Sequence, residues 1–235
     1  MENDEVTCWV CGADADTAEH KAKKSNLKAI FESVSQADPV FMHDGKRTNV
    51  PVGGFDRKSM KWSKTLCEDC NTTRTQPYDR AWDAVSAWLR GRRIEPGSVL
   101  RATAINRGYG TRKLLLDMHL YFVKSLGCYL VDGGVPFERA TFRTALLTGR
   151  PHPGVYLKFG RGALLAGQQQ VGLTDAEWIS ERAGDGSAAA AAFRTTVGPI
   201  AVLVFYQQND KVKFVSAKGA WHTRQKTSKI VIADF

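Results

Sequence analysis

The sequence TLCEDCNTTRTQ, residues 65–76, holds a Cys-x-x-Cys pair that is followed directly by an asparagine. A second Cys-x-x-Cys pair lies near the N-terminus, in TCWVCG at residues 7–12. Each pair offers two thiolates to one ion, and two pairs complete the four-thiolate tetrahedral shell of a structural zinc site. The predicted zinc ligands are Cys8, Cys11, Cys67 and Cys70.

Two unrelated redox pairs, or chance, are the alternatives to this zinc site. The first residues, MENDEVTCWVCG, are acidic and lack the apolar run of an export signal, so we expect a cytoplasmic protein. In that compartment paired Cys-x-x-Cys motifs favour zinc over disulfides. The fifth cysteine, Cys128, lies in an apolar stretch and is interpreted as a small buried hydrophobic residue.

Composition and charge limit the classes of partner. The chain has 235 residues, 43% of them hydrophobic and 24% charged, as in ordinary globular proteins. No run of about 18 apolar residues occurs, so we expect no membrane-spanning helix. The net charge of +9 favours an anionic partner, most simply nucleic acid, although solubility alone also accounts for such a charge.

The sequence predicts an α+β fold in two parts, residues 1–93 and 94–235, divided near GRRIEPGS. In the first part, apolar periodicity predicts helices over residues 25–35, with Ser25 or Asn26 as the N-cap, and over 78–90, where Pro77 suits the first turn. In the second part, helices are expected within about residues 110–148. An antiparallel sheet is expected over about 154–235, with AGDGSAAAAA, residues 183–192, as an exposed loop.

A closed four-cysteine zinc site has no open coordination position, so its predicted role is to hold other groups in place. Glu19 and His20 follow the first pair, and Asn71 follows the second. A carboxylate oxygen and an amide oxygen are ligands suited to Mg²⁺, and a neutral imidazole can take a proton from water. The alternative is that the Glu-His pair occurs by chance and that Asn71 caps the next helix.

This arrangement of Cys-x-x-Cys, Glu19-His20 and Cys-x-x-Cys-Asn71 resembles the HNH (ββα-metal) endonucleases, and is most similar to their zinc-stapled branch typified by endonuclease VII. The similarity covers about residues 6–76. It implies a ββα-metal module in which Glu19 and Asn71 bind a catalytic Mg²⁺ or Mn²⁺ ion while His20 activates water. It also implies DNA as the substrate, and a role in phage or bacterial mobile elements or antiviral defence.

The sequence departs from the family pattern at three points. Glu19 stands where aspartate is commoner, and Asn71 stands where many relatives carry histidine. The middle asparagine of the family name has no clear counterpart, with Ser63 and Asn49 as the candidates. A second hypothesis is therefore a non-catalytic zinc module that binds nucleic acid or protein. The second part of the chain is the candidate surface for a homodimer or a regulatory partner.

Basic residues near the predicted site are candidates for contacts with phosphate. Lys21, Lys23 and Lys24 follow His20, and Arg74 lies three residues after Asn71, on the same helical face. The alternatives are a solvated surface for the lysines and an ion pair, for example with Asp79, for Arg74. The other histidines have no neighbours at ligand spacing and are interpreted as ordinary residues, namely His43, His119, His152 and His222.

Overall fold

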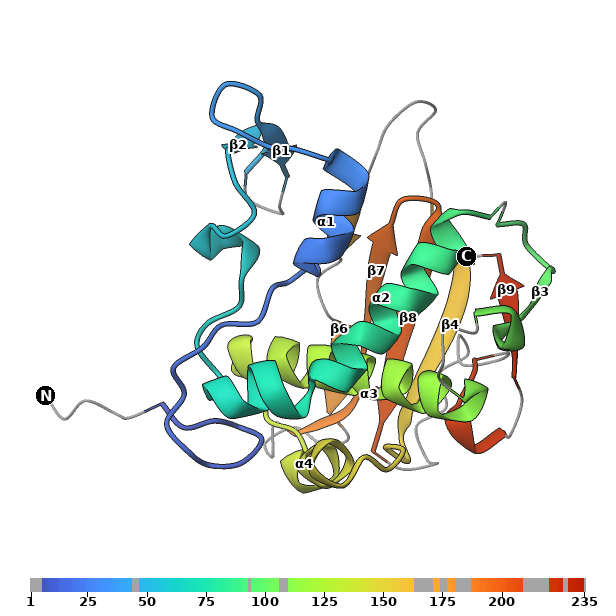
Figure 1. The fold of residues 1–235 in the computed structure, drawn as a ribbon. Helices are drawn as coiled ribbons and strands as arrows, with labels where there is room; N and C mark the ends of the chain where they lie inside the picture. Colours follow the sequence, from blue (N-terminus) through green and yellow to red (C-terminus); the bar gives the residue numbers. More distant parts are fainter. Residues whose placement is uncertain are drawn as a thin grey trace, which may run out of the picture.

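The structure is a computed structural model that describes residues 6–43, 47–92, 94–105, 110–162, 171–173, 177–180, 187–208, 220–225 and 228–234. Its described residues form helices and a large sheet, which confirms the α+β class. Figure 1 shows helices α2 and α3 crossing one face of this sheet. The principal helices are α1 (Lys24–Phe31), α2 (Gln76–Arg90), α3 (Thr111–Asp132) and α4 (Arg139–Thr148).

The large sheet has the strand order β3-β9-β4-β8-β7-β5, with β6 also paired to β7. Its pairings are antiparallel, as predicted, except that β4 and β9 run parallel. The first strand, β3, precedes the two long helices in the sequence and pairs with β9 near the C-terminus. The strands are β3 (Val99–Arg101), β4 (Val155–Arg161), β5 (Val171–Leu173), β6 (Glu177–Ser180), β7 (Ala188–Val197), β8 (Ile200–Gln207) and β9 (Lys229–Ala233).

The expected loop at residues 183–192 is wrong where the structure describes it. Ala188 begins strand β7, which lies between β6 and β8, and its first four alanines, Ala188, Ala189, Ala190 and Ala191, are buried. Small side chains let a strand pack closely against its covering layer, so an alanine run that looks like low complexity is a core strand here. Residues 183–186 lie outside the described part of the chain.

Helix α3 is the centre of the molecule. It is buried over most of its length and packs against α2, α4 and the sheet, where Tyr129 stacks on Phe193 with ring centroids 5.8 Å apart. By length and composition it could cross a membrane, but 83% of the apolar stretch is buried within the protein. A helix that is apolar on every side finds its partners inside this core.

The N-terminal part wraps along α2 and α3. It holds α1, a small hairpin of β1 (Val40–Met42) and β2 (Val50–Val52), and an extended stretch whose residues 17–20 run antiparallel to residues 61–66. The core continues across the expected boundary near residue 93: the Trp82 ring of α2 lies 4.8 Å from that of Phe122 in α3. The two-part division stays a prediction.

The predicted cap of the first helix is wrong. Helix α1 begins at Lys24, so Ser25 and Asn26 lie inside it. Asn26 is buried, and its amide oxygen accepts hydrogen bonds from Ser86 and Arg90 of α2. Its polar side chain therefore joins two helices and does not cap one.

Substitution of Gly127 by alanine should destabilise the fold. An added Cβ would lie 2.3 Å from the ring of Trp9, which is buried and has no room to move. Overpacking outweighs the gain in helix propensity, so we expect a net loss of about 1–2 kcal/mol in unfolding free energy, measured by urea denaturation. Gly54→Ala is the control, since its Cβ would meet nothing within 4 Å. Equal stability of the two variants would contradict the packing described here.

Candidate metal centre and adjoining charged site

The four predicted zinc ligands converge. The sulfur atoms of Cys8, Cys11, Cys67 and Cys70 all lie within 4.8 Å of one another, and the Sγ atoms of Cys11 and Cys67 are 3.5 Å apart. Zinc–sulfur bonds of about 2.3 Å in a tetrahedron place sulfurs roughly 3.8 Å apart, so the cluster fits a structural zinc ion. Across the described residues, no other group of three or more Cys, His, Asp or Glu side chains converges in this way.

Tight backbone turns aim both cysteine pairs at the common centre. The Cys8 amide donates to the Ala13 carbonyl at 2.6 Å, and the Gly12 amide donates to the Cys8 carbonyl at 2.8 Å. Gly12 has φ +86°, a conformation that favours glycine. In the second pair the Cys70 amide points at the Cys67 sulfur, 3.5 Å away.

The thiols differ in how readily they ionise. Burial opposes ionisation of Cys11, but hydrogen bonds from the Ala13 backbone and the neighbouring sulfurs lower its pKa to about 7. Burial raises the pKa of Cys67 and, more strongly, that of Cys70. A cation at the centre favours all four thiolates, so metal binding would release protons.

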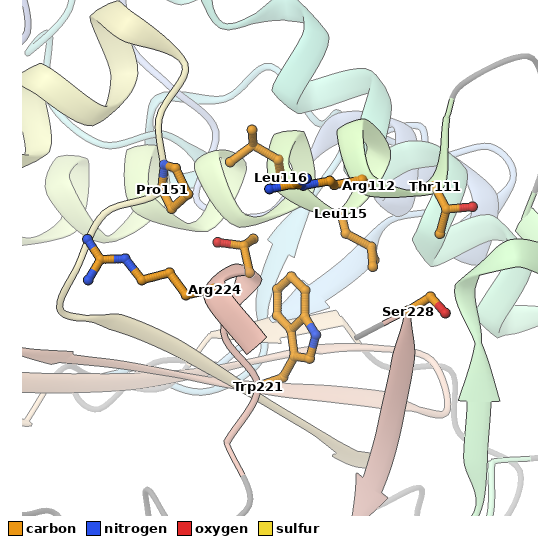
Figure 2. A pocket seen from close by; sticks show the side chains of 9 residues that line it. Thr111, Arg112, Leu115, Leu116, Pro151, Trp221, Arg224 and Ser228 are labelled. Carbon is orange, nitrogen blue, oxygen red and sulfur yellow. The ribbon is translucent and has the colours of Figure 1, made fainter. Parts of the chain in front are cut away.

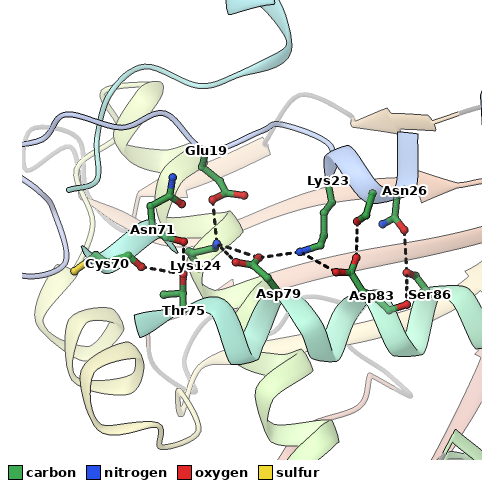
Figure 3. A network of polar contacts seen from close by, with 11 residues as sticks. Glu19, Lys23, Asn26, Cys70, Asn71, Thr75, Asp79, Asp83, Ser86 and Lys124 are labelled. Carbon is green, nitrogen blue, oxygen red and sulfur yellow. Dashed lines mark hydrogen bonds and ion pairs between the residues drawn. The ribbon is translucent and has the colours of Figure 1, made fainter. Parts of the chain in front are cut away.

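A buried lysine lies beside the metal centre. Lys124 of α3 is fully buried, and its Nζ lies 3.0 Å from Glu19 Oε2 and 3.0 Å from Asp79 Oδ2. Burial disfavours its charge, but Glu19 and Asp79 outweigh that effect and raise the pKa of Lys124. The ammonium therefore joins the N-terminal strand, α2 and α3 through one charged centre (Figure 3).

Asn71 lies in the short helical turn Asp69–Arg74 that follows the second cysteine pair. Its side chain points toward Glu19 and Lys124 in Figure 3. Its Oδ1 atom is buried and has no hydrogen-bond partner among the described residues, so the side chain does not cap α2. Asn71, Thr75, Asp79 and Asp83 recur every four residues, which sets them along one side of the helical segment that borders the site.

His20 follows Glu19 and lines the same cleft as Glu19. Its Nε2 is 3.5 Å from Asp56 Oδ1 and makes no hydrogen bond within the described structure. Burial and the nearby Lys61 lower the pKa of His20, while Glu19 and Asp56 oppose this shift. A cleft of about 230 Å³ is lined by Glu19, His20, Lys23, Lys24, Ser25, Asp79 and Asp83.

The basic residues predicted to contact phosphate are mostly paired with carboxylates of this chain. Lys23 lies 3.4 Å from Asp79 and 3.3 Å from Asp83, and Lys24 pairs with Asp56. Arg74 pairs with Asp69, and so not with Asp79. Lys21 borders a different hollow, near Met42 and Trp62. Contact of any of these four with nucleic acid stays a prediction.

The sequence did not lead us to three charged residues of the site. These are Lys124, Asp79 in its role as a partner of Lys124, and Asp56. Lys124 carried a usable signal, because a lysine in the middle of an otherwise apolar buried helix needs an internal carboxylate partner. Asp56 carried none, since it lies in a loop 36 residues beyond His20.

Three of the histidines interpreted as ordinary, His119, His152 and His222, lie close together in the structure. All three are buried, the His152 amide donates to His119 Nε2 at 3.2 Å, and the His222 ring lies 2.8 Å from the His152 carbonyl. Burial lowers the pKa of each, that of His152 to about 3. They form a neutral hydrogen-bonded cluster beneath β4, away from the cysteines. His43 is exposed, as expected.

A divalent ion would find two oxygen donors beside the cysteine cluster. The unpartnered Asn71 Oδ1 is one, and the Glu19 carboxylate, of which Oε2 faces Lys124, is the other. Mg²⁺ is commonly held by only one or two protein oxygens, with water and substrate phosphate completing its shell. The residues therefore fit such an ion, with the Lys124 ammonium as a competing cation.

Comparisons with known proteins place no family on this arrangement. No protein-family model, no curated protein and no solved structure matches the chain.

The cysteine cluster should hold one zinc ion per chain. We expect elemental analysis to find one zinc in the wild type and Cys128→Ala, and none in Cys70→Ser. Loss of zinc should lower the melting temperature by about 10 °C, because metal binding and folding are coupled. Full zinc content in Cys70→Ser would contradict the assignment of these ligands.

Removal of the buried ammonium should leave Glu19 without its ammonium partner and Asp79 with Lys23 in place of two lysines. We expect Lys124→Met to lower the unfolding free energy by about 3–5 kcal/mol in urea denaturation. The triple variant Lys124→Met, Glu19→Gln, Asp79→Asn removes all three charges and should recover most of this loss. If the triple variant were as unstable as the single one, packing of the lysine stem would be the larger effect.

Proposed function

We propose that the protein is a metal-dependent endonuclease of the HNH type that hydrolyses phosphodiester bonds in DNA. One observation carries the proposal. Glu19 and His20 lie on the extended stretch that pairs with residues 61–66, directly before Cys67. The buried Asn71 Oδ1, which has no partner among the described residues, lies on the helical turn that follows Cys67 and Cys70. Glu19 and His20 line one cleft, and the Asn71 side chain points toward Glu19, so a carboxylate, an imidazole and an amide oxygen lie near one another, as the resemblance implies.

The local backbone supports a ββα-metal module. Residues 17–20 run antiparallel to residues 61–66, with the Trp62 amide donating to the Glu19 carbonyl at 3.0 Å. The second of these stretches leads through Cys67 and Cys70 into the helical turn that carries Asn71. Two paired extended stretches followed by a helix, with the acid-His pair on the first, are the order of elements that the proposal requires.

Each residue has a role in the proposed reaction. Glu19 and Asn71 would hold Mg²⁺ or Mn²⁺, which when bound supplies positive charge to the phosphate oxygens as bond breaking proceeds. His20 would take a proton from the attacking water through its unbonded ring nitrogen. Asp56 Oδ1, 3.5 Å from that same Nε2, would balance the charge of the ring once it is protonated. Lys124 would set the position of the Glu19 carboxylate.

A non-catalytic zinc module is the second candidate, and the same lysine favours it. The Lys124 ammonium already forms an ion pair with the Glu19 carboxylate, and Lys23 and Lys24 are paired with aspartates of the chain. A site that is fully neutralised from within resembles a structural ion-pair network. Such a module would bind DNA or a protein without turnover, and its DNA binding would weaken steeply with salt.

Plasmid cleavage in Mg²⁺ and then Mn²⁺ distinguishes the two candidates. We expect His20→Ala to slow cleavage by about 10²–10⁴-fold because it removes the general base, while His43→Ala leaves the rate unchanged. Asn71→Ala should also slow cleavage and should need more divalent metal for half-maximal rate.

Zinc content of each variant separates lost chemistry from lost folding. Cleavage at the wild-type rate by zinc-loaded His20→Ala would overturn the catalytic assignment. Absence of cleavage by the wild type, together with steeply salt-dependent DNA binding, would support the binding module.

A further inference from the structure

A second cavity lies far along α3 from the charged site. It has a volume of about 490 Å³, within the range of about 300–1,000 Å³ that small-molecule sites occupy. Figure 2 shows it between the first turns of α3 and the segment that carries Trp221. Its walls are formed by Thr111, Arg112, Leu115, Leu116, Pro151, Trp221, Thr223, Arg224 and Ser228.

Two residues that line the cavity carry buried donors without an acceptor among the described residues. Trp221 is only 5% exposed, and its indole nitrogen is buried and has no hydrogen-bond partner among the described residues. In Figure 2 this nitrogen faces the side of the cavity where Ser228 lies. The hydroxyl of Thr223 is also buried and unpartnered. Both donor atoms are enclosed by the protein, so Trp221 offers the cavity its ring and not its N–H.

The charges around the cavity are all positive. Arg112 and Arg224 are exposed, and neither guanidinium pairs with a carboxylate within the described structure. Thr111 and Arg112 also form the first turn of α3, whose N-cap, Gly110, offers no side-chain cap. The free amide groups and dipole of that turn favour an anion at the same place.

The remaining wall is apolar. Leu115, Leu116 and Pro151 lie across from the face of Trp221. A flat apolar body between an indole and aliphatic side chains buries its area well, and an aromatic ring adds a preference for stacking. The lining therefore matches a ligand with one aromatic part and one anionic part.

We propose that this cavity is a binding site for a small aromatic anion, of the size of a mononucleotide or an aromatic carboxylic acid. The aromatic ring lies against Trp221 and Leu115. The phosphate or carboxylate lies between Arg112 and Arg224. This site is independent of the proposed nuclease activity.

Isothermal titration of the zinc-loaded full chain tests the proposal with three probes. Adenosine monophosphate and 4-hydroxyphenylacetate carry an aromatic ring with a phosphate or a carboxylate, and ribose 5-phosphate has the anion without the ring. We expect saturable binding of one or both aromatic anions, with at least tenfold weaker binding of ribose 5-phosphate. Which aromatic probe binds more tightly identifies the anion.

Variants assign the binding to this cavity. Trp221→Leu and the double variant Arg112→Gln, Arg224→Gln should each weaken binding at least tenfold. The matched control, Arg161→Gln, changes an exposed arginine at the far end of β4 and should bind as the wild type does. Thermal melting checks that each variant is folded, and Trp221→Phe, which keeps an aromatic ring of smaller size, gives a second test with milder packing effects than Trp221→Leu.

The proposal would be overturned by three results. These are no saturable binding of either aromatic probe at millimolar concentration, binding that the arginine and tryptophan variants leave unchanged, or ribose 5-phosphate binding as tightly as the aromatic probe that binds more tightly.

Discussion

The ion pairs of Lys124 fix how the N-terminal part sits on the core. A fully buried ammonium on α3 bonds Glu19 from the N-terminal strand and Asp79 from α2, so three segments distant in sequence depend on one charge. Burial of an ammonium costs several kcal/mol unless its partners are correctly placed. The strand that carries Glu19 and His20 therefore has one favourable position, and displacing it would leave Lys124 without part of its compensation.

The cysteine cluster complements this constraint from the other side. It joins the N-terminal loop to the segment that enters Asn71 and α2, while Lys124 joins the strand and α2 to α3. Trp9, which lies between Cys8 and Cys11, packs directly over Gly127 of α3, one turn beyond Lys124 on the same helix. Metal centre, ion pairs and aromatic packing thus meet on one short stretch of α3, and the cleft beside them is rigid on three sides.

Much of this arrangement follows from local sequence. The spacing of the cysteines within each pair predicted the metal cluster, and apolar periodicity predicted α2 and α3. Both are local patterns, because each is formed by residues only a few positions apart in the sequence. The loop predicted at Ala188 and its neighbours was wrong, since alanine has no strong preference that distinguishes a loop from a tightly packed strand. The network around Lys124 depends on contacts across 45 and 105 residues, and no local pattern specifies which aspartate or glutamate meets a given lysine. The cluster of buried histidines was not predicted for the same reason. His119 lies in a helix, and His152 and His222 lie in separate connecting segments, so only the fold brings them together.

Helix α3 also bears on how the two sites could act together. Arg112 and Lys124 are twelve residues apart, or about 18 Å along the axis, so one rigid element borders both the proposed ligand cavity and the charged site. Distance along a helix does not itself couple two sites: coupling requires two arrangements of the helix to which a ligand binds unequally. The Lys124 ion pairs and the close Trp9–Gly127 contact both resist movement of α3. A ligand in the cavity would therefore change the geometry of the charged site only to the extent that it binds a displaced position of α3 more tightly than the position described here. A ligand that fits the present cavity would stabilise the present position of Glu19.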